Sequence, residues 1–412
     1  MKNLFILLIF LLAIPSYSQE KDLNYFLDKA KNNSPLLKDL NYQIQLNTID
    51  SLLNKNSYKP QVNFNAFANY APVISGYGYD TAISNGQVLS GLVGINKKII
   101  NKNNFKAQTE NFKWIKETLQ INKKIALKDL NKAIINQYIA AFGTGEQLIY
   151  NKKIETLLQN EALLLKKLTQ NSIYKQTDYL IFASTVKQQE FVVLQLKQQF
   201  ENEVAMLSYI CGEVDTRLTV LKKPDINLQA IDKLENSIFI KNFEIDSLKI
   251  QTQNKLIDIA YKPQLSLLAD AGYLSSFAIT PYKNFGFSVG AGLIIPIYDG
   301  GQKTLNHQKN SISLEINTAY KNNFKKQLQQ QFILLNQQLQ QNTELNNQMQ
   351  SQLKISEVLI DANKKLLVTG DAQITEYVIA VGNLITINNA ISLNTTARLQ
   401  IINEINYWNL NE

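Results

Sequence analysis

The segment from residue 285 to 301 reads FGFSVGAGLIIPIYDGG, and its first part alternates between two kinds of side chain. The apolar side chains occupy every second position, at Phe285, Phe287, Val289, Ala291, Leu293, Ile295 and Ile297. Between them stand small or polar residues, at Gly286, Ser288, Gly290 and Gly292. Successive side chains of a β-strand point to opposite faces, so the pattern predicts a strand over 285–297 with one apolar face.

Three further segments alternate in the same way. Their apolar positions are Val62, Phe64, Ala66, Ala68 and Tyr70, then Leu89, Val93 and Ile95, then Leu265, Leu267, Ala269, Ala271 and Tyr273. Strands of about ten residues with aromatic side chains near their ends fit a transmembrane barrel wall, but they also fit one sheet of a soluble sandwich. In a barrel wall, the lipid-facing side chains would be Val62, Phe64, Tyr70, Leu265, Leu267, Tyr273, Phe285, Phe287, Val289 and Leu293.

Short words of sequence recur in order along the chain. Residues 58–61 and 261–264 both read YKPQ, which is an offset of 203 residues. A second pair of words, at 166–180 and 364–378, recurs with an offset of 198 residues. The difference of five falls between the two strands of each half, where a loop changes length at little thermodynamic cost. We therefore predict two repeats, of residues 19–210 and about 237–412, joined by a linker at 211–236.

In each repeat, one very long helix is predicted after the second strand. Residues 103–170 contain no proline, and residues 302–368 contain neither proline nor glycine. A helix of that length is roughly 100 Å long and needs coiled-coil partners along its whole length. A stripe with a heptad repeat supports this, at Leu328, Phe332, Leu335, Leu339, Asn342, Asn346, Met349 and Leu353, and its two asparagines are expected to form a register-setting polar layer. The long helices favour the barrel wall over the sandwich.

Composition excludes most catalytic chemistry. The 412 residues include 42 Lys and Arg, 34 Asp and Glu, one His and one Cys. A zinc cluster or a Cys–His nucleophile is improbable with one residue of each kind, and no convergent acid, base and nucleophile set is present. We therefore expect no enzyme, no metal and no cofactor. The charge of +8 is spread out, which gives no support to nucleic-acid binding.

The N-terminus predicts export. Lys2 precedes an apolar run from Leu4 to Ile14, and small residues at Ser16 and Ser18 suit cleavage before Gln19. This order is typical of a secretory signal peptide, here residues 1–18. No later segment has 18 consecutive apolar residues, so a membrane-embedded mature chain would have to cross as β-structure.

Four strands cannot close a barrel, because about eight is the practical minimum. Three copies of the chain would give twelve strands around one axis. Two copies would give eight, which also closes but leaves little lumen. The residues thus predict a fold class that is mainly α with membrane β, and three copies are the expectation that leaves a lumen.

The order of these features resembles the TolC-type outer-membrane efflux proteins. The motifs that carry the resemblance are Asn32-Asn33-Ser34-Pro35 after a short helix, Tyr58-Lys59-Pro60 and Tyr261-Lys262-Pro263 before strands, the turn at 296–301, and the helix–helix turns within 168–180 and 366–378. The resemblance implies a homotrimeric channel-tunnel in the outer membrane that extends into the periplasm, with a long coiled-coil helical barrel plus four strands per chain of a trimeric twelve-stranded β-barrel. It implies a passive exit duct of a tripartite efflux pump or a type I secretion system, with outer-membrane lipid, a periplasmic adaptor and an inner-membrane pump as partners.

The resemblance also implies two sites. Glu376, with Asp371 and Asp178 nearby, matches acids that narrow the periplasmic end, although each position equally suits a helix N-terminal acid. An adaptor-docking tip is implied at Asn171, Ser172, Ile173, Thr369 and Gly370. The first turn lacks the usual glycine, and we expect Asn171 to tolerate left-handed geometry.

Two other functions are compatible with an exported chain. A periplasmic coiled-coil adaptor also combines a helical hairpin with β segments, but it should have one hairpin and no duplicated set of amphipathic strands. An exported hydrolase would need a convergent set of catalytic groups, and the sequence offers none.

Overall fold

The computed structural model describes residues 21–84, 86–99, 102–214, 221–229, 237–276, 281–371 and 373–409. The predicted signal peptide lies outside these residues, and so does much of the predicted linker.

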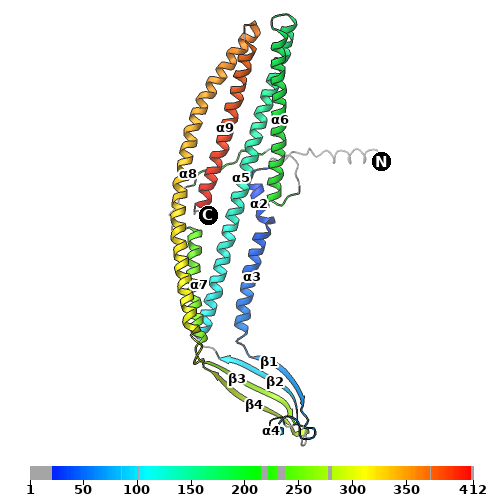
Figure 1. Ribbon diagram of the computed structural model, residues 1–412, viewed down its shortest axis with the longest axis vertical. Helices are drawn as coiled ribbons and strands as arrows, with labels where there is room; N and C mark the ends of the chain where they lie inside the picture. The colour runs from blue at the N-terminus through cyan, green and yellow to red at the C-terminus, as the bar shows by residue number, and fades with distance from the viewer. Residues whose placement is uncertain are drawn as a thin grey trace, which may run out of the picture. The chain divides into compact units, whose positions relative to one another are not determined.

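Helices dominate the described chain, and four strands interrupt them (Figure 1). In chain order the elements are α2 (Leu23–Asn33), α3 (Pro35–Asn56), β1 (Gln61–Tyr70), α4 (Thr81–Ser84), β2 (Gln87–Ile99), α5 (Lys102–Gln170), α6 (Gln176–Ile210), α7 (Ile238–Ala260), β3 (Gln264–Ser275), η2 (Pro281–Lys283), β4 (Phe285–Ile294), α8 (Gln302–Thr369) and α9 (Ile374–Trp408). The predicted long helices and four strands are confirmed. None of the described helices is both long and apolar enough to cross a membrane.

Corresponding elements of the two halves start at constant offsets. Helices α6 and α9 each contain 35 residues and start at residues 176 and 374, which are 198 apart. Strands β1 and β3 start at residues 61 and 264, which are 203 apart. The change of offset falls in the loops between β1 and β2 and between β3 and β4, since β2 and β4 start at 87 and 285.

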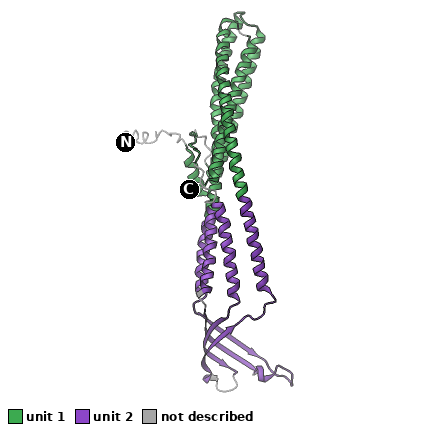
Figure 2. Cartoon of the chain, turned by 90° about the vertical axis from the view of Figure 1, so that its left-hand side faces the viewer, with its two compact units in different colours: residues 1–38, 124–237, 325–412 green, residues 39–123, 238–324 purple. Residues whose placement is uncertain are grey.

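The chain forms two compact units, each built from segments of both halves (Figure 2). Unit 1 comprises residues 1–38, 124–237 and 325–412, and unit 2 comprises residues 39–123 and 238–324. The long helices α5 and α8 contribute to both units. The compact units therefore do not coincide with the sequence repeats.

Unit 2 contains a four-stranded antiparallel sheet in the order β1-β2-β3-β4. Strand β4 is shorter than predicted, since it ends at Ile294 and the expected end at Ile297 was wrong. Pro296 lacks the backbone N–H that a ladder requires, and this limits the strand. Asp299 then caps α8, because its carboxylate accepts the backbone N–H of Gly301 at 2.9 Å and of Lys303 at 2.6 Å.

Unit 1 has two hydrophobic clusters between its helices. One cluster joins α5, α6, α8 and α9 near their connecting turns and includes Leu158, Leu165, Phe182, Leu367 and Tyr377. The other joins α2 to α5 and α6 and includes Phe26, Tyr138, Leu207 and Cys211. In the described chain, two helical hairpins, α5/α6 and α8/α9, thus share one core.

The predicted stripe on α8 is its buried face. Leu328, Phe332, Leu335 and Met349 are buried. Asn342 is buried as well and forms a reciprocal pair with Asn394 of α9: each side-chain amide donates to the other's backbone carbonyl, at 2.9 and 3.1 Å. Such a pair forms in only one register, which is the role predicted for Asn342, while Asn346, the other predicted member of the polar layer, is only partly buried.

Gly143 interrupts helix-forming residues in α5 because α9 packs closely there. A Cβ atom at Gly143 would lie 2.3 Å from Oγ1 of Thr396. Glycine is thus required by the close approach of the two helices, at some cost in intrinsic helix stability.

Candidate functional site

The register of the sheet places all ten predicted lipid-facing residues on one face. Directly opposed residues of an antiparallel sheet share a face. Phe64 opposes Val93, which opposes Ala271, which opposes Phe287, so this row crosses all four strands. By the alternation along each strand, the same face carries Val62, Phe64, Tyr70, Leu265, Leu267, Tyr273, Phe285, Phe287, Val289 and Leu293.

This apolar face is uncovered in the single chain. Phe287 is 84% exposed, Val289 is 79% exposed and Tyr70 is 74% exposed. Tyr273 and Phe285 oppose each other, and their rings meet edge to face with centroids 5.3 Å apart. Soluble monomers rarely expose a continuous apolar face of this kind, so it marks an interaction surface.

The opposite face is mainly polar or small. It carries Asn63, Asn65 and Asn69 of β1, Ser90 and Asn96 of β2, and glycines and a serine of β4. Its apolar exceptions are Phe67, Val88, Leu92, Leu268, Leu274 and Ile294. Ser288 donates a hydrogen bond to the carboxylate of the opposed Asp270 at 2.7 Å. The sheet therefore has one apolar face and one mainly polar face.

Both edges of the sheet are open in the chain as described. Strand β1 pairs only with β2, and β4 pairs only with β3. An open edge presents unpaired backbone donors and acceptors and is a template for pairing with another chain.

The first helix–helix turn, between α5 and α6, contains a left-handed residue. That residue is Ser172, with φ of +62°, so the expectation that Asn171 takes this geometry was wrong. The backbone N–H of Asn171 still bonds in helical fashion to Lys167 at 3.1 Å, and the chain reverses only after it. Ser172 lies 198 residues before Gly370, which is left-handed too, with φ of +87°.

The two turns contact each other within unit 1. A Cβ atom at Gly370 would lie 2.8 Å from Cγ2 of Ile173. The hydroxyl of Tyr174 donates a hydrogen bond to the carbonyl of Leu367 at 3.1 Å. The structure thus brings together the predicted tip residues Ile173 and Gly370, with Thr369 beside them.

The three predicted gate acids differ in their surroundings. The carboxylate of Asp178 accepts a hydrogen bond from the backbone N–H of Lys175 at 3.0 Å and so caps the N-terminus of α6. This is the alternative role of a helix N-terminal acid. Glu376 lies in the first helical turn of α9, and Asp371 lies in the connection between α8 and α9. Both side chains are exposed. Within the described residues neither of their carboxylates forms an ion pair or hydrogen bond.

Sequence reasoning missed Glu161, a nearly buried carboxylate in α5 with 4% exposure. Its Oε2 accepts a hydrogen bond from the hydroxyl of Tyr377, and its Oε1 lies 3.6 Å from Nζ of Lys364. Burial raises the pKa of Glu161, while the bond from Tyr377 and the charge of Lys364 act in the opposite direction. Glu161 continues the buried stripe of Leu158 and Leu165, and an acid in such a stripe was the available signal.

Solved structures of outer-membrane channels share this fold. The outer membrane protein VceC of Vibrio cholerae is 12% identical with a TM-score of 0.77, and the alignment covers 94% of this chain and 97% of that one. The CmeC outer membrane channel of Campylobacter jejuni is 13% identical with a TM-score of 0.75, covering 95% and 87%. The open-state MtrE outer membrane channel of Neisseria gonorrhoeae is 11% identical with a TM-score of 0.77, covering 94% and 88%.

No family model and no curated protein matches the chain by sequence. The structural likenesses extend over nearly the whole described chain and establish its fold: long helices with a four-stranded antiparallel sheet, as in TolC-type channels.

Proposed function

We propose that this chain is one protomer of a homotrimeric outer-membrane channel of the TolC type. The sheet would form one third of a twelve-stranded barrel in the outer membrane, and the helices would extend into the periplasm as a tube. The chain would act as a passive exit duct for a tripartite efflux pump or a type I secretion system, with no catalytic chemistry of its own.

The observation that carries this proposal is the two-sided sheet. Ten apolar side chains share one face, and the other face is mainly polar and glycine-rich. A membrane barrel wall needs this division, with lipid outside and water inside. The aromatic residues Tyr70, Tyr273 and Phe285 lie at one end of the sheet, where barrels carry an aromatic girdle.

The open edges support three copies. A barrel removes exposed edges only by closing, and four strands are too few. Pairing of β1 in one copy with β4 in the next would satisfy both edges, and a cyclic trimer would reach twelve strands. The presence of two helical hairpins per chain argues against the alternative of a periplasmic adaptor, for which a single hairpin is expected.

We propose that Glu376 and Asp371 narrow the periplasmic end. Three copies of two exposed acids would concentrate negative charge around one axis and select for cations. The neighbouring turns, with Ile173 against Gly370, would form the adaptor-docking tip.

The proposal is tested by fractionation and conductance. The protein should sediment with outer membranes, require detergent for release, and form channels in planar lipid bilayers. Recovery of the protein in the soluble fraction without detergent, with no channel activity, would refute it.

A further inference from the structure

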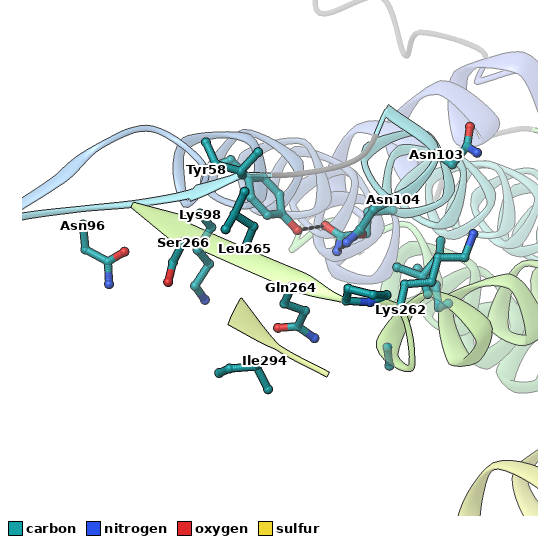
Figure 3. Close-up of a pocket in the computed structure, with 16 residues that line it drawn as sticks. Tyr58, Asn96, Lys98, Asn103, Asn104, Lys262, Gln264, Leu265, Ser266 and Ile294 are labelled. Atoms are coloured by element: carbon teal, nitrogen blue, oxygen red, sulfur yellow. Dashed lines mark hydrogen bonds between the residues drawn. The ribbon is translucent and has the colours of Figure 1, made fainter. Parts of the chain in front are cut away.

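A cavity of about 560 Å³ lies in unit 2, at the end of the sheet nearest the helices (Figure 3). Its walls come from β2 and β3, the end of β4, the residues after α3 and the facing ends of α5 and α7. We refer to it as the junction cavity. The volume is that of a site for a small organic molecule.

The described lining of the junction cavity carries positive charge only. Lys98 and Lys262 line it, and none of the other described lining residues is an aspartate or a glutamate, although Lys262 also borders a neighbouring hollow lined by Glu110 and Asp258. Some other lysines of unit 2 have carboxylate partners, as for Lys255 with Glu110 at 3.0 Å. Within the described residues, neither Lys98 nor Lys262 forms an ion pair. The cavity therefore favours a negatively charged ligand.

A chain of side-chain hydrogen bonds orders one wall. The hydroxyl of Tyr58 donates to Oε1 of Gln108 at 2.5 Å, and Nε2 of Gln108 donates to Oδ1 of Asn104 at 2.9 Å. This series of hydrogen bonds ends on the amide NH2 of Asn104, which has no partner among the described residues. Because its last group is a donor, the wall offers hydrogen bonds to an acceptor.

The apolar part of the lining comes mainly from the end of α7 and the residues after it, at Leu256, Ile259, Ala260 and Pro263, while Asn96, Asn103, Gln264 and Ser266 add polar groups. The ligand that fits both parts has an oxyanion for the lysines and the amide and an apolar substituent for the apolar part.

The position of the junction cavity points to a water-borne ligand. Lys98 and Ser266 oppose each other on the polar face of the sheet and line the cavity with Asn96 and Gln264 of the same face, whereas Ile99 and Leu265 line it from the apolar face at the end of the strands. Lys98 and Ser266 belong to the inner strands β2 and β3, so neither lies on the β1 or β4 edge along which copies would pair.

We propose that the junction cavity binds small organic oxyanions, phosphates or carboxylates that carry an apolar group, from the aqueous side of the sheet. Lys98 and Lys262 would supply the charge, Asn104 a hydrogen bond, and Leu256 with its neighbours the apolar contact. The ligand's route through the molecule rests on the proposed function, whereas its binding does not.

Hexyl phosphate is the probe, measured by calorimetry on the intact protein purified in an uncharged detergent. The double variant Lys98→Gln with Lys262→Gln should weaken binding at least about tenfold, since it removes both charge-assisted contacts. Lys97→Gln is the matched control, because Lys97 lies on the same strand but on the opposite face. Equal weakening in the control, or no binding by the unmodified protein, would overturn the proposal.

Three comparisons define the ligand. Hexanol and inorganic phosphate should each bind at least about tenfold more weakly than hexyl phosphate, because each lacks one half of the match. Equal binding of inorganic phosphate would overturn the apolar half. Reconstitution into nanodiscs of phosphatidylglycerol should leave hexyl phosphate binding as in phosphatidylcholine, and strong competition by the anionic lipid would overturn the aqueous source.

The proposed duct and the proposed site fail in different ways. A protein that conducts ions but binds no hexyl phosphate contradicts the site alone. A protein that binds it through Lys98 and Lys262 but forms no channel contradicts the duct alone.

Discussion

The hydroxyl of Tyr377 donates a hydrogen bond to Oε2 of Glu161, which joins the second helical hairpin to the buried face of the first. Tyr377 also stacks on Phe182 of α6, with ring centroids 5.9 Å apart. The bond satisfies one oxygen of a nearly buried carboxylate, while the other has only Lys364 at 3.6 Å. This pair therefore makes the packing of the two hairpins sensitive to protonation.

Stability should fall as pH rises through the titration of Glu161. Its folded pKa is raised above the ordinary value of 4.5, so the folded state binds the proton more tightly than the unfolded state. The stabilisation from this group is complete below pH 4.5 and is lost as pH passes the raised pKa. Thermal unfolding of the Glu161→Gln variant between pH 4 and 8 should lack this loss. Glu146 is an exposed acid on the same helix, and the control variant Glu146→Gln should keep the loss of stability with rising pH. If the Glu161→Gln variant showed the same pH dependence as the unmodified protein, Glu161 would not be the group responsible.

Replacement of Tyr377 by phenylalanine should destabilise the hairpin contact. The variant keeps the stack on Phe182 but leaves a buried carboxylate oxygen without its donor, at a cost of about 1–3 kcal/mol. Chemical denaturation at neutral pH measures this cost. The penalty should shrink in a Glu161→Gln background, and full additivity of the two changes would show that the residues do not act on each other.

The left-handed turn residues should respond oppositely to substitution. Ser172→Gly removes the steric cost of a left-handed side chain and should stabilise the protein by up to about 1 kcal/mol. Gly370→Ala imposes that cost and also places a Cβ 2.8 Å from Ile173, so it should destabilise. Gly382→Ala, where nothing lies within 4 Å, is the control and should be neutral or stabilising. Thermal midpoints give the order, and a stable Gly370→Ala variant would mean that the turns are not packed as described.

Charge at Glu376 should control ion selectivity. In a trimer, Glu376→Gln removes three carboxylates from the narrow end, so cation preference and block by multivalent cations should both decrease. Single-channel recording measures both. Asp361→Asn, an exposed acid on α8, is the control and should leave them unchanged. Unaltered selectivity and block in the Glu376→Gln channel would refute the gate.

The two faces of β4 should differ in their tolerance of charge. Val289→Lys places an ammonium group on the apolar face at the middle of β4 and should cost roughly 2–4 kcal/mol of membrane stability, the range for a lysine near the bilayer midplane. Ser288→Lys, one residue along the same strand, lies on the polar face and should insert normally. Heat resistance of the assembled protein in membranes compares the variants. Similar behaviour of both would mean that the face carrying Val289 is not in lipid.

Much of the fold was predictable because its signals are local and periodic. Strict alternation gave the face of Phe285, Phe287 and Val289, and the absence of proline gave the long helices. The end of β4 was misjudged because the apolar pattern continues past Pro296, whose missing N–H matters more than its hydrophobic neighbours.

The parts that escaped prediction depend on contacts between distant segments. Ser172 rather than Asn171 is left-handed because the backbone N–H of Asn171 still bonds to the carbonyl of Lys167, so the helical hydrogen-bond pattern extends through Asn171. Residue preferences alone do not reveal where this pattern ends. The partners of Glu161, Lys364 and Tyr377, lie 203 and 216 residues away in the sequence. The apolar stripe on α5 could suggest that Glu161 is buried, but nothing in the sequence could identify Tyr377 as its hydrogen-bond donor. The junction cavity has no signature in any single segment.

Above all, the edge strands of three copies should pair with one another and close a single twelve-stranded β-barrel in the membrane. Native mass spectrometry of protein released from outer membranes by mild detergent tests it most directly, alongside unboiled gel electrophoresis. Three copies per particle, held together until the detergent micelle is disrupted by heat, are the predicted result. A monomer that stays soluble without detergent would contradict the account.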